Sequence, residues 1–270
     1  MRDGTNQKII SLQLFECGCC VNDFGRAIKY HKNDWRKFGA LCVLIKHRDI
    51  GYILFDTGYS SKIYDCGFAG KIYCRANPTF VAIDDMLVSK LKQQNILPSD
   101  ISYCILSHAH PDHIGGMKDF NTTYLMTYDT YLDLQNASVR NLVFKDLVPN
   151  NFAFKLVEET ICNSIFDKWF LTYDLFGDMS VLGVYLPGHS KGHMGIYIPE
   201  AKVLFAGDAS WDYNMLANGF YMKFFAKKLQ YDYNIYFDTT LKLSNFSTTH
   251  RDIDIIFSHS DIQEGKLWGN

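Results

Sequence analysis

The pattern of hydrophobic and polar positions divides the chain into short strand-like runs, several of which end in Gly, Asp or His. Residues 9–15 alternate apolar and polar side chains, which predicts an opening β-strand. Residues 41–45 and 52–55 predict a hairpin that turns at residues 48–51. Short apolar runs predict further strands at 101–106, 123–126, 179–186, 195–198, 203–206 and 253–257.

Helical spacing of apolar residues is confined to three segments, 84–94, 129–134 and 235–246. Residues 22–38 and 59–79 show no clear period, so we expect a surface loop and an irregular segment there. Residues 138–175 interleave aromatic and charged side chains without a period. Such a segment either caps a site or adds a layer of packing, and its pattern favours neither interpretation.

The length and composition suit one large domain. The chain has 270 residues, of which 47% are hydrophobic and 15% aromatic, enough for a sizeable core. We find no internal repeat, low-complexity segment or linker, so we expect residues 1–270 to form a single α/β domain.

The charge balance argues against two classes of partner. The formal net charge is −2, which favours neither nucleic acid nor an anionic membrane surface. Residues 1–7 are polar and lack the apolar core of a signal peptide, and no apolar run is long enough to span a bilayer. We therefore expect a cytoplasmic protein whose eight cysteines are free thiols. Cys17, Cys19 and Cys20 cluster without a second Cys pair, which favours structural or incidental thiols over a metal or redox site.

The stretch 107–113 carries the strongest chemical signal. It places His108, His110, Asp112 and His113 directly after a predicted buried strand and before a Gly-Gly turn. Their spacing cannot put them all on one helical face, because neighbours on a helix are three or four residues apart. In an irregular loop such side chains can diverge and bind two neighbouring metal ions, for which imidazole and carboxylate are suitable ligands. A merely solvated polar loop would not need this density of ligand-type residues.

Three more ligand-type residues follow strand-like runs. His189 lies in a Pro-Gly-His turn, Asp208 follows a glycine, and His259 follows the last predicted strand. One histidine after a strand is usually structural or solvated. Three such positions in a chain with the 107–113 stretch predict that they join one metal site.

Together these motifs resemble the dinuclear metal signature of the metallo-β-lactamase superfamily, and Asp56-Thr57-Gly58 resembles a strand-end motif of many members. The resemblance implies an αββα sandwich: two mixed β-sheets flanked by helices, with the metals at one sheet edge. It also implies the ligands. His108, His110 and His189 would bind one metal ion, Asp112, His113 and His259 the other, and Asp208 would bridge both.

Within the superfamily the chain is most similar to the N-acyl-homoserine-lactone lactonases. The resemblance implies two divalent metal ions. Histidine at position 110, where diiron flavoprotein relatives tend to carry Glu, favours a zinc hydrolase over a redox enzyme, with iron, cobalt and manganese as alternative metals. The resemblance also implies opening of a lactone ring by a metal-bound hydroxide, with Asp112 passing a proton to the leaving group. The lactonases carry a catalytic tyrosine three residues beyond the bridging Asp. This chain has Trp211 there, so either Trp211 or Tyr213 takes that role, or the substrate differs.

Other functions stay open at this point. The resemblance also fits a thioesterase of the glyoxalase II kind or another esterase, and a non-catalytic ligand sensor on the same fold. A phosphodiesterase acting on nucleic acid is disfavoured by the lack of a basic run, and a secreted β-lactamase by the lack of a signal sequence. We expect a small-molecule lactone or ester as substrate and either a monomer or a homodimer. The aromatic run Trp211, Tyr213, Phe220, Tyr221, Phe224 and Phe225 either lines an acyl pocket or packs a helix.

Overall fold

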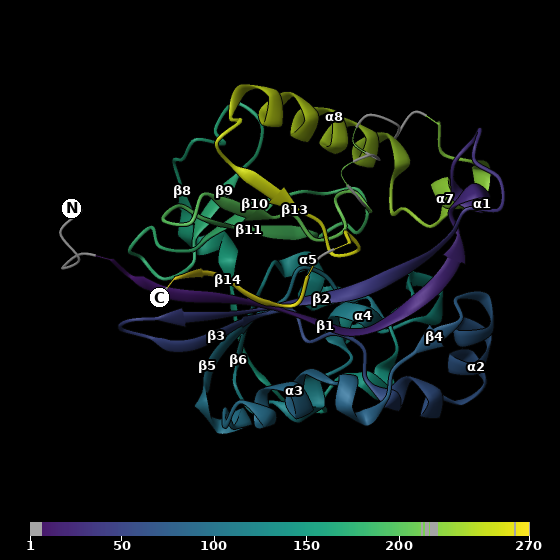
Figure 1. The fold of residues 1–270 in the computed structure, drawn as a ribbon, viewed down its shortest axis with the longest axis horizontal. Helices are drawn as coiled ribbons and strands as arrows, with labels where there is room; N and C mark the ends of the chain where they lie inside the picture. Colours follow the sequence, from purple (N-terminus) through teal and green to yellow (C-terminus); the bar gives the residue numbers. More distant parts are fainter. Residues whose placement is uncertain (1–6, 212, 214–215, 217–220, 262, 270) are drawn as a thin grey trace.

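Two β-sheets form the centre of the protein in the computed structural model, which describes residues 7–211, 213, 216, 221–261 and 263–269 (Figure 1). Over these residues the larger sheet has eight strands. In spatial order they are β14 (Gly265–Gly269), β1 (Ile9–Asp23), β2 (Trp35–His47), β3 (Gly51–Phe55), β5 (Ile101–Ile105), β6 (Thr123–Met126) and β7 (Ala153–Leu156), with β4 (Thr79–Phe80) paired to β1. The smaller sheet has the order β13 (Asp254–Ile256), β12 (Val203–Phe205), β11 (Met194–Ile198), β10 (Leu182–Tyr185), β9 (Thr172–Asp174) and β8 (Ile161–Cys162).

Helices cover the outer faces of both sheets. The helices are α1 (Phe24–Ala27), α2 (Gly67–Ala76), α3 (Leu87–Gln93), α4 (Pro111–Ile114), α5 (Tyr128–Gln135), α7 (Phe224–Lys228) and α8 (Tyr233–Thr249). Short 3₁₀ turns occupy Ser61–Asp65, Ile83–Asp85, Pro98–Asp100, Met117–Asp119, Val139–Asn141, Lys145–Leu147 and Val157–Thr160. Figure 1 shows α8 over the smaller sheet and α3 under the larger one, so the expected αββα sandwich is confirmed.

The core is layered in the same way. One cluster of buried side chains, including Val43, Ile53, Ile196 and Phe205, joins the inner faces of the two sheets. Other clusters fill the space between each sheet and its helices. Because apolar faces are buried on both sides of each sheet, the central strands are nearly continuous hydrophobic runs rather than strict alternations.

Parallel pairing determines where the strand ends meet. β3, β5 and β6 run parallel to one another, so the residues after β3 and β5 emerge at the same edge of the larger sheet. β12 and β13 are also parallel, which brings the residues after both strands together. The motifs at 56–58, 107–113, 207–208 and 258–259 all follow these strands.

Most predicted strands and helices are confirmed, but residues 22–38 and 59–79 contain more regular structure than expected. The hairpin of β2 and β3 turns where expected, and α8 covers the helical spacing at 235–246. Residues 22–38 are only partly a loop, because β1 and β2 extend to Asp23 and Trp35 and α1 follows β1, which leaves an irregular turn at residues 29–34. Residues 59–79 contain α2, whose weak pattern reflects burial of little more than Gly70 and Tyr73.

Residues 138–175, where we expected a cap or a packing layer, contribute β7, β8 and β9 to the edges of the two sheets. Across the described residues, no helix is both long and apolar enough to cross a membrane.

The contact between α8 and the loop before β9 gives a test of the packing. Phe246 is fully buried and stacks on Phe166 with ring centroids 4.4 Å apart. Replacing Phe246 with Ala should lower the free energy of unfolding by about 3–5 kcal/mol, because it leaves a cavity between helix and sheet. Leu241→Ala, on the exposed side of the same helix, should change it by less than about 0.5 kcal/mol in the same urea titration. Equal effects of the two substitutions would contradict this packing.

Candidate metal centre

Asp56 and the residues after β5 form the floor of the site. Asp56 follows β3 directly, is fully buried, and has a left-handed backbone conformation (φ 59°), which is strained for a residue other than glycine. Its Oδ1 accepts from the Ser107 backbone N–H, and its Oδ2 accepts from the Ser107 hydroxyl, both at 2.8 Å. The strained residue thereby joins the ends of the parallel strands β3 and β5.

The 107–113 stretch differs from the expected irregular loop. His110 is the N-cap residue of α4, which begins at Pro111 and carries Asp112 and His113 in its single turn. Proline is favoured in the first turn of a helix because it has no backbone N–H to leave unpaired. His108 and His110 fall in one group of possible ligands and Asp112 and His113 in another, although the backbone here is helical rather than irregular.

Glycines allow the tight turns that precede His189 and Asp208. Gly188 precedes His189 with φ 123°, and a Cβ atom there would lie 2.2 Å from the Tyr236 backbone nitrogen. Gly207 precedes Asp208 with φ 55°, and a Cβ atom would lie 2.7 Å from His193 Nε2. Only glycine fits these close approaches without strain.

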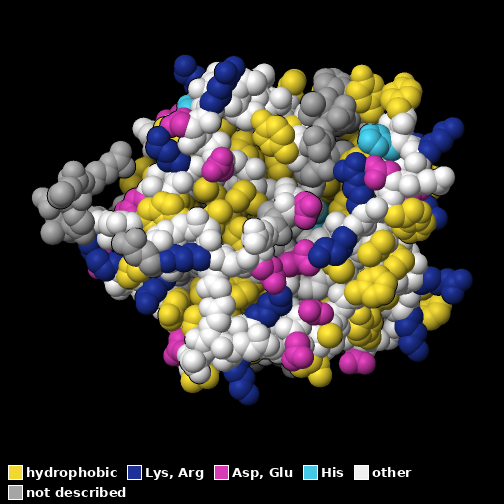
Figure 2. Space-filling model, in the orientation of Figure 1, with side chains coloured by type: hydrophobic (Ala, Val, Ile, Leu, Met, Phe, Trp, Pro, Cys, Tyr) yellow, Lys and Arg dark blue, Asp and Glu magenta, His cyan; other side chains and the backbone are white. Residues whose placement is uncertain are grey.

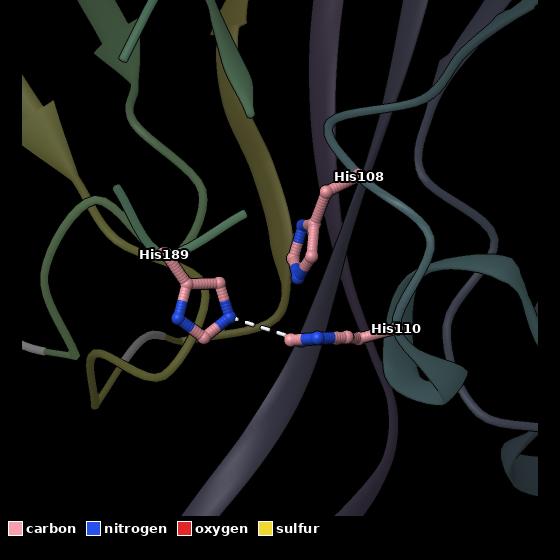
Figure 3. A group of neighbouring side chains, drawn as sticks. All are labelled: His108, His110 and His189. Carbon is pink, nitrogen blue, oxygen red and sulfur yellow. Dashed lines mark hydrogen bonds between the residues drawn. The ribbon is translucent and has the colours of Figure 1, made fainter. Parts of the chain in front are cut away.

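The structure gathers the seven predicted ligand residues into two adjacent groups. His108, His110 and His189 form one group, and Asp112, His113, Asp208 and His259 form the other. Within each group the ligand-type atoms lie within 4.8 Å of one another. Figure 3 shows His189 Nε2 facing the His110 ring, with His108 above both, and the distance from His189 Nε2 to His110 Nδ1 is 3.0 Å.

Asp208 lies between the two groups. Its Oδ2 is 3.3 Å from His189 Nε2 and 3.2 Å from His259 Nε2, and its Oδ1 is 3.4 Å from His113 Nε2. The two oxygens of one carboxylate can each meet a different cation, so Asp208 is placed to bridge.

Hydrogen bonds on the outer side of the rings orient them. The Nδ1–H groups of His113, His189 and His259 donate to Asp56 Oδ2 (2.7 Å), Gln230 Oε1 (2.9 Å) and the Gly39 carbonyl (2.8 Å). This arrangement directs the Nε2 lone pairs inward, as the partners of metal-binding histidines commonly do.

The inward atoms fit divalent cations. His108 Nε2, His113 Nε2 and Asp208 Oδ1 are buried and have no hydrogen-bond partner, and the 3.4 Å between the last two is too long for a hydrogen bond. Leaving buried polar atoms unpaired costs about 1–3 kcal/mol each. Cations at the centre of each group would satisfy them.

The pKa values of the histidines are shifted in opposite directions in the two ligand groups. Burial lowers the pKa of His110 to about 3 and holds the pKa of His108 well below its usual value. Burial also acts to lower the pKa of His113 and His259, but the nearby carboxylates raise it, well above the ordinary value for His113 and to about 9 for His259. The ligand group that contains Asp112 and Asp208 therefore favours positive charge, and a bound cation would replace the protons on His113 and His259.

A cavity of about 370 Å³ opens beside the two groups. His110, Asp112, Asp208 and His259 lie at its base, and Trp211 lines its wall. Further lining residues include Cys20, Phe24, Phe38, Tyr59, Tyr73, Phe225 and Leu229. The cavity is thus mainly apolar with a polar base, as small-molecule sites usually are.

The two candidates for the role of the lactonase tyrosine, Trp211 and Tyr213, lie in different environments. Trp211 faces the cavity and packs edge-on against Phe38, with ring centroids 6.3 Å apart. Tyr213 is 58% exposed and is not among the described residues that line the cavity, so the structure does not support its expected role. Of the rest of the aromatic run, Phe225 lines the cavity, Tyr221 and Phe224 are exposed, and Phe220 lies outside the described residues.

The groups that hold the ligands in place carry little signal in the sequence. His193 is buried, donates from Nδ1 to the Leu186 carbonyl, and accepts the Asp208 backbone N–H at Nε2. Gln230 lies between α7 and α8, 41 residues from the histidine that it orients. No local motif marks Gln230. The Asp-Thr-Gly motif did mark Asp56, and its role in joining β5 to His113 is visible only in three dimensions.

Comparison with known proteins agrees with this geometry. Residues 35–249 match the family model described as the metallo-beta-lactamase superfamily. The chain belongs to this superfamily and is similar, at modest identity, to N-acyl homoserine lactonases. In the structure, the eight cysteines are all free thiols. Cys20, which belongs to the 17–20 cluster, lines the cavity.

Individual relatives are distant. An N-acyl homoserine lactonase of Bacillus cereus is 28% identical over 180 residues, which are 63% of each chain. The chain thus spans less than two thirds of the lactonase's length. A Mycobacterium tuberculosis protein named as a probable metallo-hydrolase is 25% identical over 271 residues, covering 93% of this chain and 80% of the relative. The structure of an N-acyl homoserine lactone hydrolase with N-hexanoyl-L-homoserine at its catalytic metal center superposes with a TM-score of 0.72 at 21% identity, over 94% of each chain.

Gln230 gives a test of the site's support. Gln230→Ala removes the acceptor for His189 Nδ1–H, so the Nε2 lone pair is no longer directed inward. Zinc affinity, measured against a competing chelator, should fall about 10- to 100-fold. Gln230→Glu keeps an acceptor oxygen and should retain most of the affinity. Unchanged zinc binding by the Ala variant would contradict the orienting role.

Proposed function

We propose that the protein is a dinuclear metal-dependent hydrolase that opens a lactone ring, with an N-acyl-homoserine lactone or a related ester as substrate. The position of Asp208 carries this proposal, because its carboxylate contacts histidines of both ligand groups. The lactonases among its relatives support the substrate class.

In this proposal His108, His110 and His189 would hold one cation, Asp112, His113 and His259 would hold the other, and Asp208 would contact both. Two such cations would supply an activated water and a Lewis acid for the substrate carbonyl. Zn²⁺ is the proposed metal because five of the seven ligands are imidazoles, which suit zinc. A dizinc quorum-quenching lactonase has the same fold, with a TM-score of 0.53 at 16% identity.

Asp112 is proposed to transfer a proton to the leaving group. It lines the cavity, and its Oδ2 lies 3.4 Å from His113 Nε2 and 3.6 Å from His259 Nε2. Burial acts to raise the pKa of Asp112, but His113 outweighs it and the net pKa is lowered. An ionised carboxylate here can accept the proton that the attacking water loses and return it to the leaving alkoxide.

The walls of the cavity define the acyl part of the substrate. Phe24, Phe38, Phe225 and Leu229 present apolar surface to it, and Trp211 lies on the same wall. An acyl chain would lie against these side chains while the lactone reaches the base. The indole N–H of Trp211 can donate to a substrate carbonyl, as the hydroxyl of the lactonase tyrosine does.

Trp211 also favours a second candidate. An indole is bulkier than a phenol and has no hydroxyl, so a different ester, such as the thioester of a glyoxalase II-like enzyme, would suit the same centre.

A substrate panel separates the candidates. The zinc-loaded protein should show its highest kcat/KM with acyl-homoserine lactones, a lower value with S-lactoylglutathione, and none with a chromogenic β-lactam. Asp208→Ala should abolish turnover and lower bound zinc, because it removes the bridge between the two groups. Full zinc loading with no turnover of any lactone would refute the lactonase proposal. Unchanged turnover by the Asp208 variant would refute the metal mechanism.

Replacing Trp211 tests the carbonyl contact. Trp211→Tyr exchanges the indole N–H for a hydroxyl that can donate to the same carbonyl, so kcat/KM for a lactone should change by less than about twofold. Trp211→Phe removes the donor and should lower kcat/KM by roughly two- to tenfold, the value of one hydrogen bond. If both variants behave alike, Trp211 acts through its bulk rather than its N–H group.

A further inference from the structure

Two segments far apart in sequence form one exposed face beside the cavity. The α1–α7 face consists of residues 24–37 and 221–229. Lys29 N donates to the Tyr221 carbonyl and Lys223 N to the Ala27 carbonyl, each at 2.7 Å, and Ile28 forms a bridge with Met222. Figure 1 shows α1 and α7 side by side at the right-hand end of the molecule.

This face exposes large apolar side chains. Tyr30 is 87% exposed, Phe225 79%, Phe224 66%, Trp35 58% and Leu229 52%. Tyr30 packs edge-on against Tyr221, and Phe224 against Phe225, with ring centroids 5.5 and 6.0 Å apart. Single exposed apolar residues are ordinary, but several on one face indicate an interaction surface. Figure 2 shows hydrophobic and basic side chains intermixed at this end of the molecule.

The same face is strongly basic. Its two segments contain eight Lys and Arg residues and one Asp, in a chain whose net charge is −2. The single acid, Asp34, is paired with Arg36 and His31. Lys37 pairs with Glu16, and Lys223 donates to the Gly25 carbonyl. Several of the remaining cations lie over aromatic rings: Arg26 over Trp35, Lys227 over Tyr233 and Lys228 over Phe224.

We propose that the α1–α7 face docks on an anionic lipid surface. Exposed aromatic rings that enter the interfacial region, with lysines that extend to the headgroups, are the features by which interfacial proteins bind anionic bilayers. A second copy of the chain fits less well, because a two-fold contact would bring like charges together. Nucleic acid would use the charges but would leave Phe224 and Phe225 in water.

Docking there would connect the bilayer with the cavity. Phe24, Arg26, Ala27, Phe225 and Leu229 belong to the face and also line the cavity that ends at Asp112 and His259. An amphiphilic molecule held in the bilayer could therefore enter with its polar group leading toward the ligand groups. The proposal concerns binding alone and does not depend on which bond the enzyme breaks.

This proposal departs from the expectation that the chain has no membrane partner. That expectation rested on the net charge of the whole chain and on the lack of a basic run within any one segment. The face is assembled from segments about 190 residues apart, so neither measure could reveal it.

Vesicle sedimentation tests the proposal with the full chain. The protein should sediment with vesicles that contain phosphatidylglycerol and not with pure phosphatidylcholine vesicles, and added salt should weaken binding. Lys29→Gln with Lys228→Gln should weaken it on the order of 30-fold, because each lysine contributes about fivefold. Phe224→Ser should weaken it at least about tenfold by removing apolar area. Lys92→Gln with Lys266→Gln makes the same charge change on exposed residues of α3 and β14 and should change binding less than about twofold.

Several results would overturn the proposal. These are no sedimentation of the wild-type protein with phosphatidylglycerol vesicles at low salt, equal losses in the face and control variants, and competition by a short DNA duplex as strong as by the vesicles. A wild-type dimer that the Lys29/Lys228 or Phe224 variants convert to monomers would show instead that the face binds a second copy. Thermal unfolding by circular dichroism, expected to be unchanged in these surface variants, excludes misfolding as the cause of lost binding.

Discussion

Five buried or half-buried imidazoles and the Asp112 carboxylate converge on Asp208 with too few hydrogen bonds among them, and much of the surrounding structure holds them there. Such a cluster lowers the stability of the fold, because buried polar atoms without hydrogen-bond partners are unfavourable. The protein offsets this with hydrogen bonds on the outer side of each ring. Asp56, Gln230, the Gly39 carbonyl and Ser107 each hold a ligand histidine from behind.

The two sheets share this task. The larger sheet supplies Asp56 and the 107–113 stretch from the ends of parallel strands, and the smaller sheet supplies Asp208 and His259 in the same way. The His259 ring donates across to a carbonyl of β2, and the Met194 backbone N–H donates to the Ser107 carbonyl. The site therefore depends on the relative position of the two sheets, and their shared apolar core keeps that position fixed.

Local patterns in the sequence, short apolar runs with Gly, His and Asp at their ends, marked the strands and the candidate ligand residues. The sandwich and the division of the ligands into two groups were predicted from the family resemblance that those motifs carry. The sequence was not sufficient where the signal is spread over space. Gln230 has no motif, Tyr213 has the right residue type but is exposed, and the α1–α7 face combines segments whose charges cancel in a whole-chain average. The short helix α4 was missed because four residues carry too little periodicity to distinguish a turn of helix from a loop.

The central claim is that the two ligand groups hold a pair of metal ions bridged by Asp208. X-ray diffraction from crystals of the zinc-soaked protein, recorded on both sides of the zinc absorption edge, tests it most directly. The account predicts two anomalous peaks, one within the group of His108, His110 and His189 and one within the group of Asp112, His113 and His259, with Asp208 in contact with both. A single peak, or peaks away from these residues, would contradict it.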